Sequence, residues 1–235
     1  MQTAHRLTGP KKLAQNTSFS MSEFFMRHRF VILLGTILFM IIGGPFLRAI
    51  FQYKIITDVL LTVIFAAAIF AISQKRINIF ISLGLAVPMF ASTWSYYFFK
   101  SSQLLAAAQV FGVLFVGFTI NCLIKFIFSQ KTVTREVIYA AMIVYLLMAI
   151  TWSFAYSMLE YFFPGSFSSP QGAEQDFFHF LYFSYVTITT LGYGDVLPLT
   201  QKAKSLVMLE AVTGQMYLVV AVAWLVGMHV SRRSR

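Results

Sequence analysis

Six long apolar runs, separated by short polar or basic stretches, constrain the fold of this chain more than any other feature of its sequence. They lie at residues 30–47, 55–73, 77–99, 103–128, 137–159 and 206–230. A helix needs about 20 apolar residues to cross the hydrocarbon core of a bilayer, so each run predicts a transmembrane helix. Composition agrees, because hydrophobic residues make up 58% of the 235 residues, charged residues only 11%, and mean hydropathy is +0.75. We therefore predict an all-α integral membrane protein with six transmembrane helices.

The basic residues are distributed unevenly between the two sides of the predicted helices. With both termini in the cytoplasm, thirteen Lys and Arg residues fall on the inner side and five on the outer side. Because cytoplasmic loops are enriched in basic residues, this bias predicts a multi-pass plasma-membrane protein with both termini inside. Basic loops facing the cytoplasm and anionic lipid also explain the net charge of +10. We therefore expect the lipid bilayer, and no nucleic acid, as a partner.

A short apolar segment and a glycine-containing loop lie between the last two runs. The segment, 177–188, is too short to cross a bilayer, and the loop that overlaps its end, 187–195, reads Thr-Ile-Thr-Thr-Leu-Gly-Tyr-Gly-Asp. Because such short elements occur at membrane depth only when they are buried in protein or line a cavity, we predict a re-entrant pore helix. Gly192 and Gly194 allow backbone conformations that other residues avoid. Successive carbonyl oxygens of the loop can then face one way and replace the water shell of an alkali cation.

This loop resembles the selectivity filter of tetrameric potassium channels, whose signature reads Thr-x-Thr-Thr-Val-Gly-Tyr-Gly-Asp. The resemblance is specific from about residue 137 to 230 and only topological for 30–128, and it suggests a six-transmembrane member of bacterial type without an arginine-rich sensor helix. It implies that K⁺, the transported ion, binds the backbone oxygens of Thr190, Leu191, Gly192 and Tyr193, with Gly194 completing the filter. Leu191 stands where most members have Val. Since one loop cannot encircle an ion, we expect a homotetramer.

Further residues are expected to support the filter. They are Asp195, Tyr182, Glu210, Thr187 and Thr189. By resemblance, Asp195 caps the outer end of the filter and accepts a hydrogen bond from the pore helix, for which Tyr182 is the available donor. Glu210 is unexpected in a membrane helix, where an ionisable group is costly. It is expected to pack against Ser184, Thr187 or Thr189, and both a structural hydrogen bond and a proton-sensitive gating role remain open.

The last helix carries a stripe at i, i+4 spacing below Glu210, formed by Gly214, Leu218 and Val222. By resemblance, Gly214 falls at a gating hinge, although a small residue that allows close packing against the pore helix is an equal alternative. Leu218 and Val222 would line the cavity below it, where apolar side chains can gate by dewetting.

The chain divides into three predicted parts. Residues 1–29 form a cytoplasmic N-terminal segment with an interfacial helix at 19–30, and 129–235 form the pore domain. Residues 30–128 form a four-helix, sensor-like domain without gating charges, because its fourth helix carries Gln109, Asn121 and Lys125 instead of a series of arginines. Only five residues follow Val230, so we expect no attached ligand-binding domain. The gating stimulus stays open among lipid, pH, tension, a separate regulatory partner and the filter itself.

The sequence thus predicts a K⁺-selective channel that conducts passively through a Thr-Leu-Gly-Tyr-Gly filter and is not steeply voltage-gated. Two alternatives remain, a non-selective cation channel and a non-conducting membrane subunit that keeps the pore fold. We expect neither enzymatic activity nor an organic cofactor, since no catalytic triad, metal cluster or phosphate loop is recognisable in the sequence. The small size and lack of targeting segments favour a prokaryotic membrane.

Overall fold

The computed structural model describes residues 21–51, 55–168 and 175–233, and within them it contains seven helices and no strand. The helices are α1 (Met21–Phe51), α2 (Ile55–Ile72), α3 (Arg76–Phe99), α4 (Ser102–Ser129), α5 (Arg135–Phe162), α6 (Phe177–Ile188) and α7 (Gln201–Arg233). Six of them contain a stretch long and apolar enough to cross a membrane, and α6 is the short exception. The all-α fold with six membrane-competent helices is therefore confirmed.

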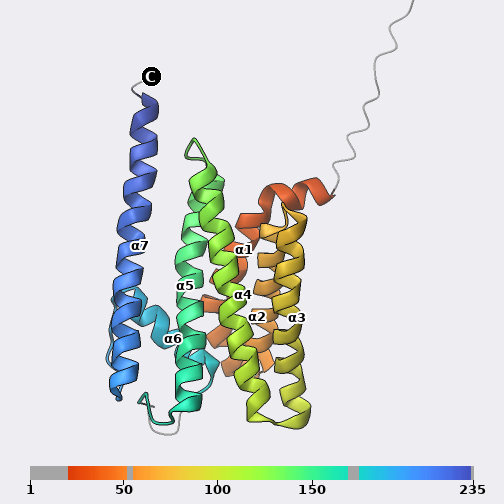
Figure 1. Ribbon diagram of the computed structural model, residues 1–235, viewed down its shortest axis with the longest axis vertical. Coiled ribbons are helices and arrows are strands. Elements are labelled where there is room, and N and C mark those ends of the chain that lie inside the picture. Colours follow the sequence, from red (N-terminus) through yellow and green to blue (C-terminus); the bar gives the residue numbers. More distant parts are fainter. Residues whose placement is uncertain (1–20, 52–54, 169–174, 234–235) are drawn as a thin grey trace, which may run out of the picture.

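The long helices run side by side, and the described chain begins and ends near the same end of the bundle (Figure 1). The first turns of α1 run sideways before the helix turns along its neighbours, which is the geometry of a helix that enters the membrane from its interface. Residues 1–20, including part of the predicted interfacial helix, lie outside the described residues. So do residues 169–174 of the loop that leads to α6.

The first helix extends beyond its predicted apolar run of 30–47, because α1 continues through Pro45 to Phe51. Proline is tolerated inside membrane helices when neighbouring elements accommodate it. Gly44 does not end the helix but allows close packing against α6, since a Cβ at this position would lie 3.3 Å from the ring of Phe178. The last helix is also longer than its apolar run, beginning at Gln201, and the Thr200 hydroxyl accepts a hydrogen bond from the amide of Ala203 at 3.3 Å.

One apolar core continues across the predicted boundary at residue 128. It contains buried residues of α1 to α5, such as Leu33, Phe65, Phe115 and Leu147. Gly112 of α4 allows a close approach to α5, because a Cβ there would lie 2.8 Å from the ring of Phe154. The four-helix domain and the outer helix of the pore domain are therefore packed as one body.

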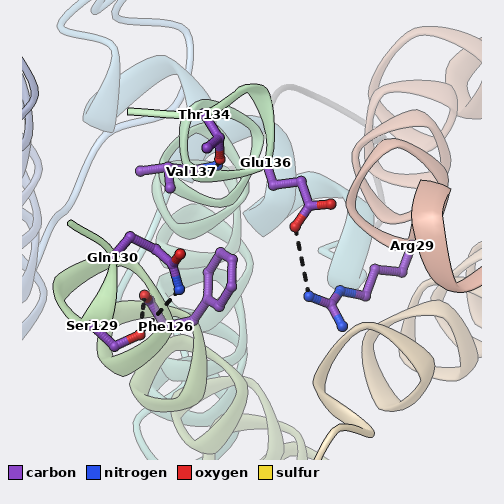
Figure 2. Close-up of polar contacts among 7 residues, drawn as sticks. All are labelled: Arg29, Phe126, Ser129, Gln130, Thr134, Glu136 and Val137. Carbon is purple, nitrogen blue, oxygen red and sulfur yellow. Dashed lines mark hydrogen bonds and ion pairs between the residues drawn. The ribbon is translucent and has the colours of Figure 1, made fainter. Parts of the chain in front are cut away.

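Arg29 ties α1 to the start of α5 at the end of the bundle where both helices begin. Its guanidinium is buried, lies 4.6 Å from the ring centroid of Phe30, and approaches Glu136 at 3.8 Å (Figure 2). Close by, Thr134 caps α5, with its hydroxyl accepting from the amide of Val137 at 3.4 Å. These contacts fix α1 relative to the pore domain, and with it the helices that pack on α1.

Candidate functional site: the loop after α6

The helix α6 has the predicted bounds and lies between α5 and α7 (Figure 1). Asp176 caps its N-terminus, and its carboxylate accepts from the amide of His179 at 3.0 Å. An acidic residue here also complements the positive end of the helix dipole, which leaves the negative end at the loop that follows. A cation near that loop is therefore favoured by the direction of α6.

Hydroxyl groups fasten α6 to α5 along its length. Tyr145 of α5 donates to the carbonyl of Ile188 at 2.8 Å, and Tyr185 of α6 donates to that of Leu146 at 3.1 Å. Ser184 adds a third contact, with its hydroxyl oxygen 2.8 Å from the carbonyl oxygen of Ala149. Because helix carbonyls are already engaged within their helices, these additional bonds position α6 without disrupting α5. The C-terminal end of α6, where the loop starts, is thereby held in place.

The backbone after α6 alternates between two conformations. Thr190, Gly192 and Gly194 have positive φ values of 60°, 58° and 78°, whereas Leu191 and Tyr193 between them do not. Such alternation turns successive peptide planes so that their carbonyls can lie on one side. Glycine adopts positive φ without strain, but Thr190 does so at a cost. Non-glycine residues in this region mark constrained and often functional backbone.

The amides of the loop point back at α6. The Thr190 amide donates to the carbonyl of Thr187 at 2.9 Å, and the amides of Leu191 and Gly192 donate to that of Val186 at 2.9 and 3.2 Å. No described residue donates a hydrogen bond to the carbonyl oxygens of residues 190–193. The amide groups of the loop are thus hydrogen-bonded to the end of α6, and its carbonyl oxygens remain as a run of acceptors. Carbonyl oxygens are the ligand type that alkali cations require.

The loop lies on the surface of the single chain. The side chains of Leu191 and Tyr193 are 55% and 68% exposed, as expected for a segment that has no partner on one side. The two threonines at the end of α6 have local contacts, with the Thr189 hydroxyl donating to the carbonyl of Tyr185 at 2.6 Å and the Thr187 carbonyl accepting from the Thr190 amide.

At the far end of the loop, Tyr182 donates a hydrogen bond to Asp195 at 2.6 Å, which is the predicted contact. The other carboxylate oxygen accepts from the amide of Val196 at 3.1 Å. The bond to Asp195 raises the pKa of Tyr182 to about 12, so its hydroxyl stays protonated and remains a donor. Asp195 is therefore anchored to α6 and to the chain that leads to α7.

Behind the loop, Glu210 of α7 is completely buried and accepts hydrogen bonds from Ser184 of α6 and Tyr156 of α5. Ser184 was one of its three predicted partners, and neither Thr187 nor Thr189 is among the described hydrogen-bond partners of the Glu210 carboxyl group. Tyr156 was not predicted, since nothing in the sequence distinguishes it from the other ten tyrosines. One carboxylate thus links all three helices of the pore domain.

Aromatic rings surround this carboxylate. Tyr156 contacts Phe183 and Phe167, with ring centroids 5.3 and 5.2 Å apart, and Phe180 contacts Phe167 at 5.4 Å. Phe183 belongs to this buried apolar cluster together with Tyr156, Phe167 and Phe180. The dry surroundings strengthen the hydrogen bonds of Glu210.

Gly214 is buried one turn below Glu210, and a Cβ there would lie 2.5 Å from Cγ1 of Ile188. This contact supports the packing alternative, while α7 passes through Gly214 without a break. Farther along the stripe, Leu218 is half-buried and Val222 is 57% exposed in the single chain. Their predicted place beside an ion cavity stays a prediction.

Among the described residues, no group of three or more His, Cys, Asp or Glu side chains could hold a metal ion. The acceptors of the site are instead backbone carbonyl oxygens, the ligand type that alkali cations require.

Comparison with known proteins gives information on the part of the chain that holds the site. No curated protein and no solved structure matches the chain. Residues 132–230, which contain α5, α6, the loop and most of α7, match the family model described as "Ion channel", and the match indicates an ion channel.

Proposed function

We propose that this protein is a potassium-selective channel that conducts K⁺ passively through the loop of residues 190–194. The observation that carries the proposal is the backbone of this loop, with alternating positive φ values, amides bonded back to α6 and carbonyl oxygens without donors. A dehydrated K⁺ needs a column of such oxygens to replace its hydration shell. Thr190, Leu191, Gly192 and Tyr193 would supply them.

We further propose that four copies assemble around one axis, with the loops at its centre. The loop and much of α7 are exposed in the single chain, although α7 is largely apolar. The exposed large apolar residues of α7 are Met208, Leu209, Val212, Met216, Val219, Val220, Val222, Val226 and Val230. A homotetramer would cover the pore-facing and intersubunit parts of this surface and leave lipid on the rest.

In this tetramer, each four-helix domain would pack on the pore domain of its own chain. Residues 130–134 connect α4 to α5 directly, and Gln109 of α4 donates to the hydroxyl of Ser157 in α5 at 2.5 Å. A short connection between packed antiparallel helices leaves no length for the domain to reach a neighbouring subunit.

The test is a flux assay with purified protein in liposomes that carry K⁺ or Na⁺ gradients. We expect K⁺ flux that drives the membrane potential toward the K⁺ equilibrium value, with Na⁺ unable to substitute. A reversal potential that ignores the K⁺/Na⁺ ratio would instead identify a non-selective cation channel. Absence of flux from correctly assembled tetramers would identify a non-conducting subunit.

A further inference from the structure

A cavity of ≈ 300 Å³ lies outside the pore, at the end of the bundle where α2 and α4 begin and α3 and α5 end. Its walls come from these four helices and from the first residues of α6. The volume is about ten times the share of one water molecule in the liquid. The cavity can therefore hold a small organic molecule.

Two buried polar side chains line this cavity without satisfying their hydrogen-bonding capacity. Thr57 of α2 is 5% exposed and Gln109 of α4 is 4% exposed, and both belong to the cavity wall. The hydroxyl of Thr57 and the Oε1 of Gln109 have no hydrogen-bond partner among the described residues. The amide nitrogen of Gln109 already donates to Ser157, so its oxygen is the acceptor that remains. Buried polar groups are rarely left in this state, which points to a bound partner that donates hydrogen bonds.

The charged groups in the cavity wall indicate the sign of the charge on that partner. The carboxyl groups of Asp58 and Asp176 both border the cavity. Asp58 accepts a hydrogen bond from the Tyr97 hydroxyl, and Asp176 accepts one from the backbone of His179. Two carboxyl groups in the wall disfavour an anion, and a cation with N–H groups fits both of them and the unpaired acceptors of Thr57 and Gln109.

Aromatic side chains in the same wall favour an organic cation over a metal ion. Phe90, Tyr96, Phe177 and Phe178 line the cavity with Tyr97, and aromatic faces attract ammonium groups. A Ca²⁺ site needs six to eight oxygen ligands, whereas the described residues contain no group of three or more His, Cys, Asp or Glu side chains for a metal.

We propose that this cavity is a binding site for a small organic ammonium ion, which donates to Gln109 and Thr57 and is neutralised by Asp58 and Asp176. Because Asp176 caps α6, the bound ion would contact the helix that leads to the loop of residues 190–194. The site itself does not require that this loop conducts.

The proposal can be tested by calorimetric titration of the purified, assembled protein in amine-free phosphate buffer. The probes are methylammonium, butylammonium and benzylammonium chloride, with benzyl alcohol as the neutral counterpart of the last. We expect saturable binding of at least one ammonium ion and at least about tenfold weaker binding of the alcohol, because charge-assisted hydrogen bonds would be lost.

Two variants and one control locate the binding. Asp58→Asn removes the charge and Thr57→Val removes the hydroxyl with little change in shape, so each should weaken ammonium binding by roughly tenfold. Thr119→Val is the control, since Thr119 is an equally buried threonine of α4 that bonds within its own helix and lies outside the cavity wall. Each variant is first checked for an unchanged assembly size and melting temperature.

Three results would overturn the proposal. They are the absence of saturable binding for all three ammonium ions, equal affinity for benzylammonium and benzyl alcohol, and unchanged affinity in both folded variants. The first result would mean that the cavity holds only water molecules. Since binding is measured directly, failure of K⁺ flux would not produce any of these results.

Discussion

The pore domain and the four-helix domain both bury polar side chains, but they satisfy them differently. Behind the loop of residues 190–194, the carboxylate of Glu210 has two hydroxyl donors from two other helices. In α1 to α4, by contrast, three buried atoms have no partner among the described residues, on Arg29, Thr57 and Gln109, while the pore domain has one, on His179. The pore domain is thus fixed by polar contacts around its backbone loop. The four-helix domain is held mainly by apolar packing and leaves polar atoms available to a ligand.

This difference has a physical basis. A column of carbonyl oxygens repels itself and keeps its geometry only if its surroundings over-determine it. Hydroxyl contacts from Tyr145 and Ser184 and the buried Glu210 supply that constraint. Helices in a bundle need no such constraint, because van der Waals packing sets their positions. The comparison therefore predicts that polar deletions will affect conduction in one domain and mainly stability or ligand binding in the other.

Deleting the buried carboxylate should have the largest effect. Glu210→Ala leaves the hydroxyls of Tyr156 and Ser184 buried without an acceptor and opens a void, at a total cost of about 3 kcal/mol or more. We expect a lower melting temperature of the assembled protein and loss of K⁺ flux. Glu210→Gln, which keeps one acceptor oxygen and the shape, is the matched control and should lose less. Equal melting temperatures for the wild type and Glu210→Ala would contradict the structural role of the cluster.

The same Gln variant separates the two open roles of Glu210. A purely structural hydrogen bond predicts the same pH profile of K⁺ flux for Glu210→Gln as for the wild type. A proton-sensitive gating role predicts that the variant loses pH dependence, because an amide cannot titrate. We expect the structural outcome, since both carboxylate oxygens are held by hydroxyl donors. Flux measured at several external pH values decides between them.

Replacing a glycine by alanine at one position in each domain should have the next largest effect. Gly214→Ala would place a Cβ 2.5 Å from Ile188, and Gly112→Ala would place one 2.8 Å from the ring of Phe154. Each overpacked contact should cost about 1–3 kcal/mol. Only the first displaces the end of α6, so we expect Gly214→Ala to reduce K⁺ flux and Gly112→Ala to reduce stability alone.

Each substitution has a control on its own helix. A Cβ at Gly227 of α7 or at Gly117 of α4 meets nothing within 4 Å. Alanine at these positions should be neutral or slightly stabilising, since glycine is the poorer helix former. Reduced flux in Gly112→Ala at unchanged stability would contradict the proposal that contacts in the four-helix domain affect stability and not conduction.

The sequence alone predicts much of this fold, and its errors have physical causes. Apolar length located the six spans, and the bounds of α6 were exact because Asp176 starts the helix and the glycine loop ends it. Apolar length marks the membrane-buried part of a helix, however, and not its ends. The polar turn at the start of α7 and the last turn of α1, beyond residue 47, were therefore missed.

The backbone of the loop and the Tyr182–Asp195 contact could be predicted because they depend on local sequence. The partners of Glu210 could be predicted only in part, since Ser184 lies on the short helix α6 just before the loop, but Tyr156 comes from α5, 54 residues away. The same limit applies to the cavity beside Gln109. Its unpaired atoms depend on how α2 and α4 pack, and no short-range pattern encodes that arrangement.

Two tyrosine–carboxylate pairs allow a smaller and more specific comparison. Tyr182 donates to Asp195 beside the loop, and Tyr97 donates to Asp58 in the four-helix domain. Tyr182→Phe and Tyr97→Phe each remove one hydrogen bond, worth about 1 kcal/mol. We expect Tyr182→Phe to lower the K⁺/Na⁺ flux ratio and Tyr97→Phe to leave it unchanged. Loss of selectivity in both variants would show that the four-helix domain also controls the loop.

The smallest effect is expected for the charge on α4. One elementary charge that crossed the whole membrane would contribute about 2.3 kcal/mol per 100 mV, and steep gating needs three to four such charges in each subunit. In α4, Lys125 is the single charged residue, and it lies exposed near the end of the helix, where little of the field would be crossed. In planar bilayers, Lys125→Gln should therefore leave the slope of conductance against voltage unchanged, as should the control Lys75→Gln at the start of α3. A flatter slope in Lys125→Gln alone would mean that α4 moves through the field, and the four-helix domain would then be a sensor and not a static support.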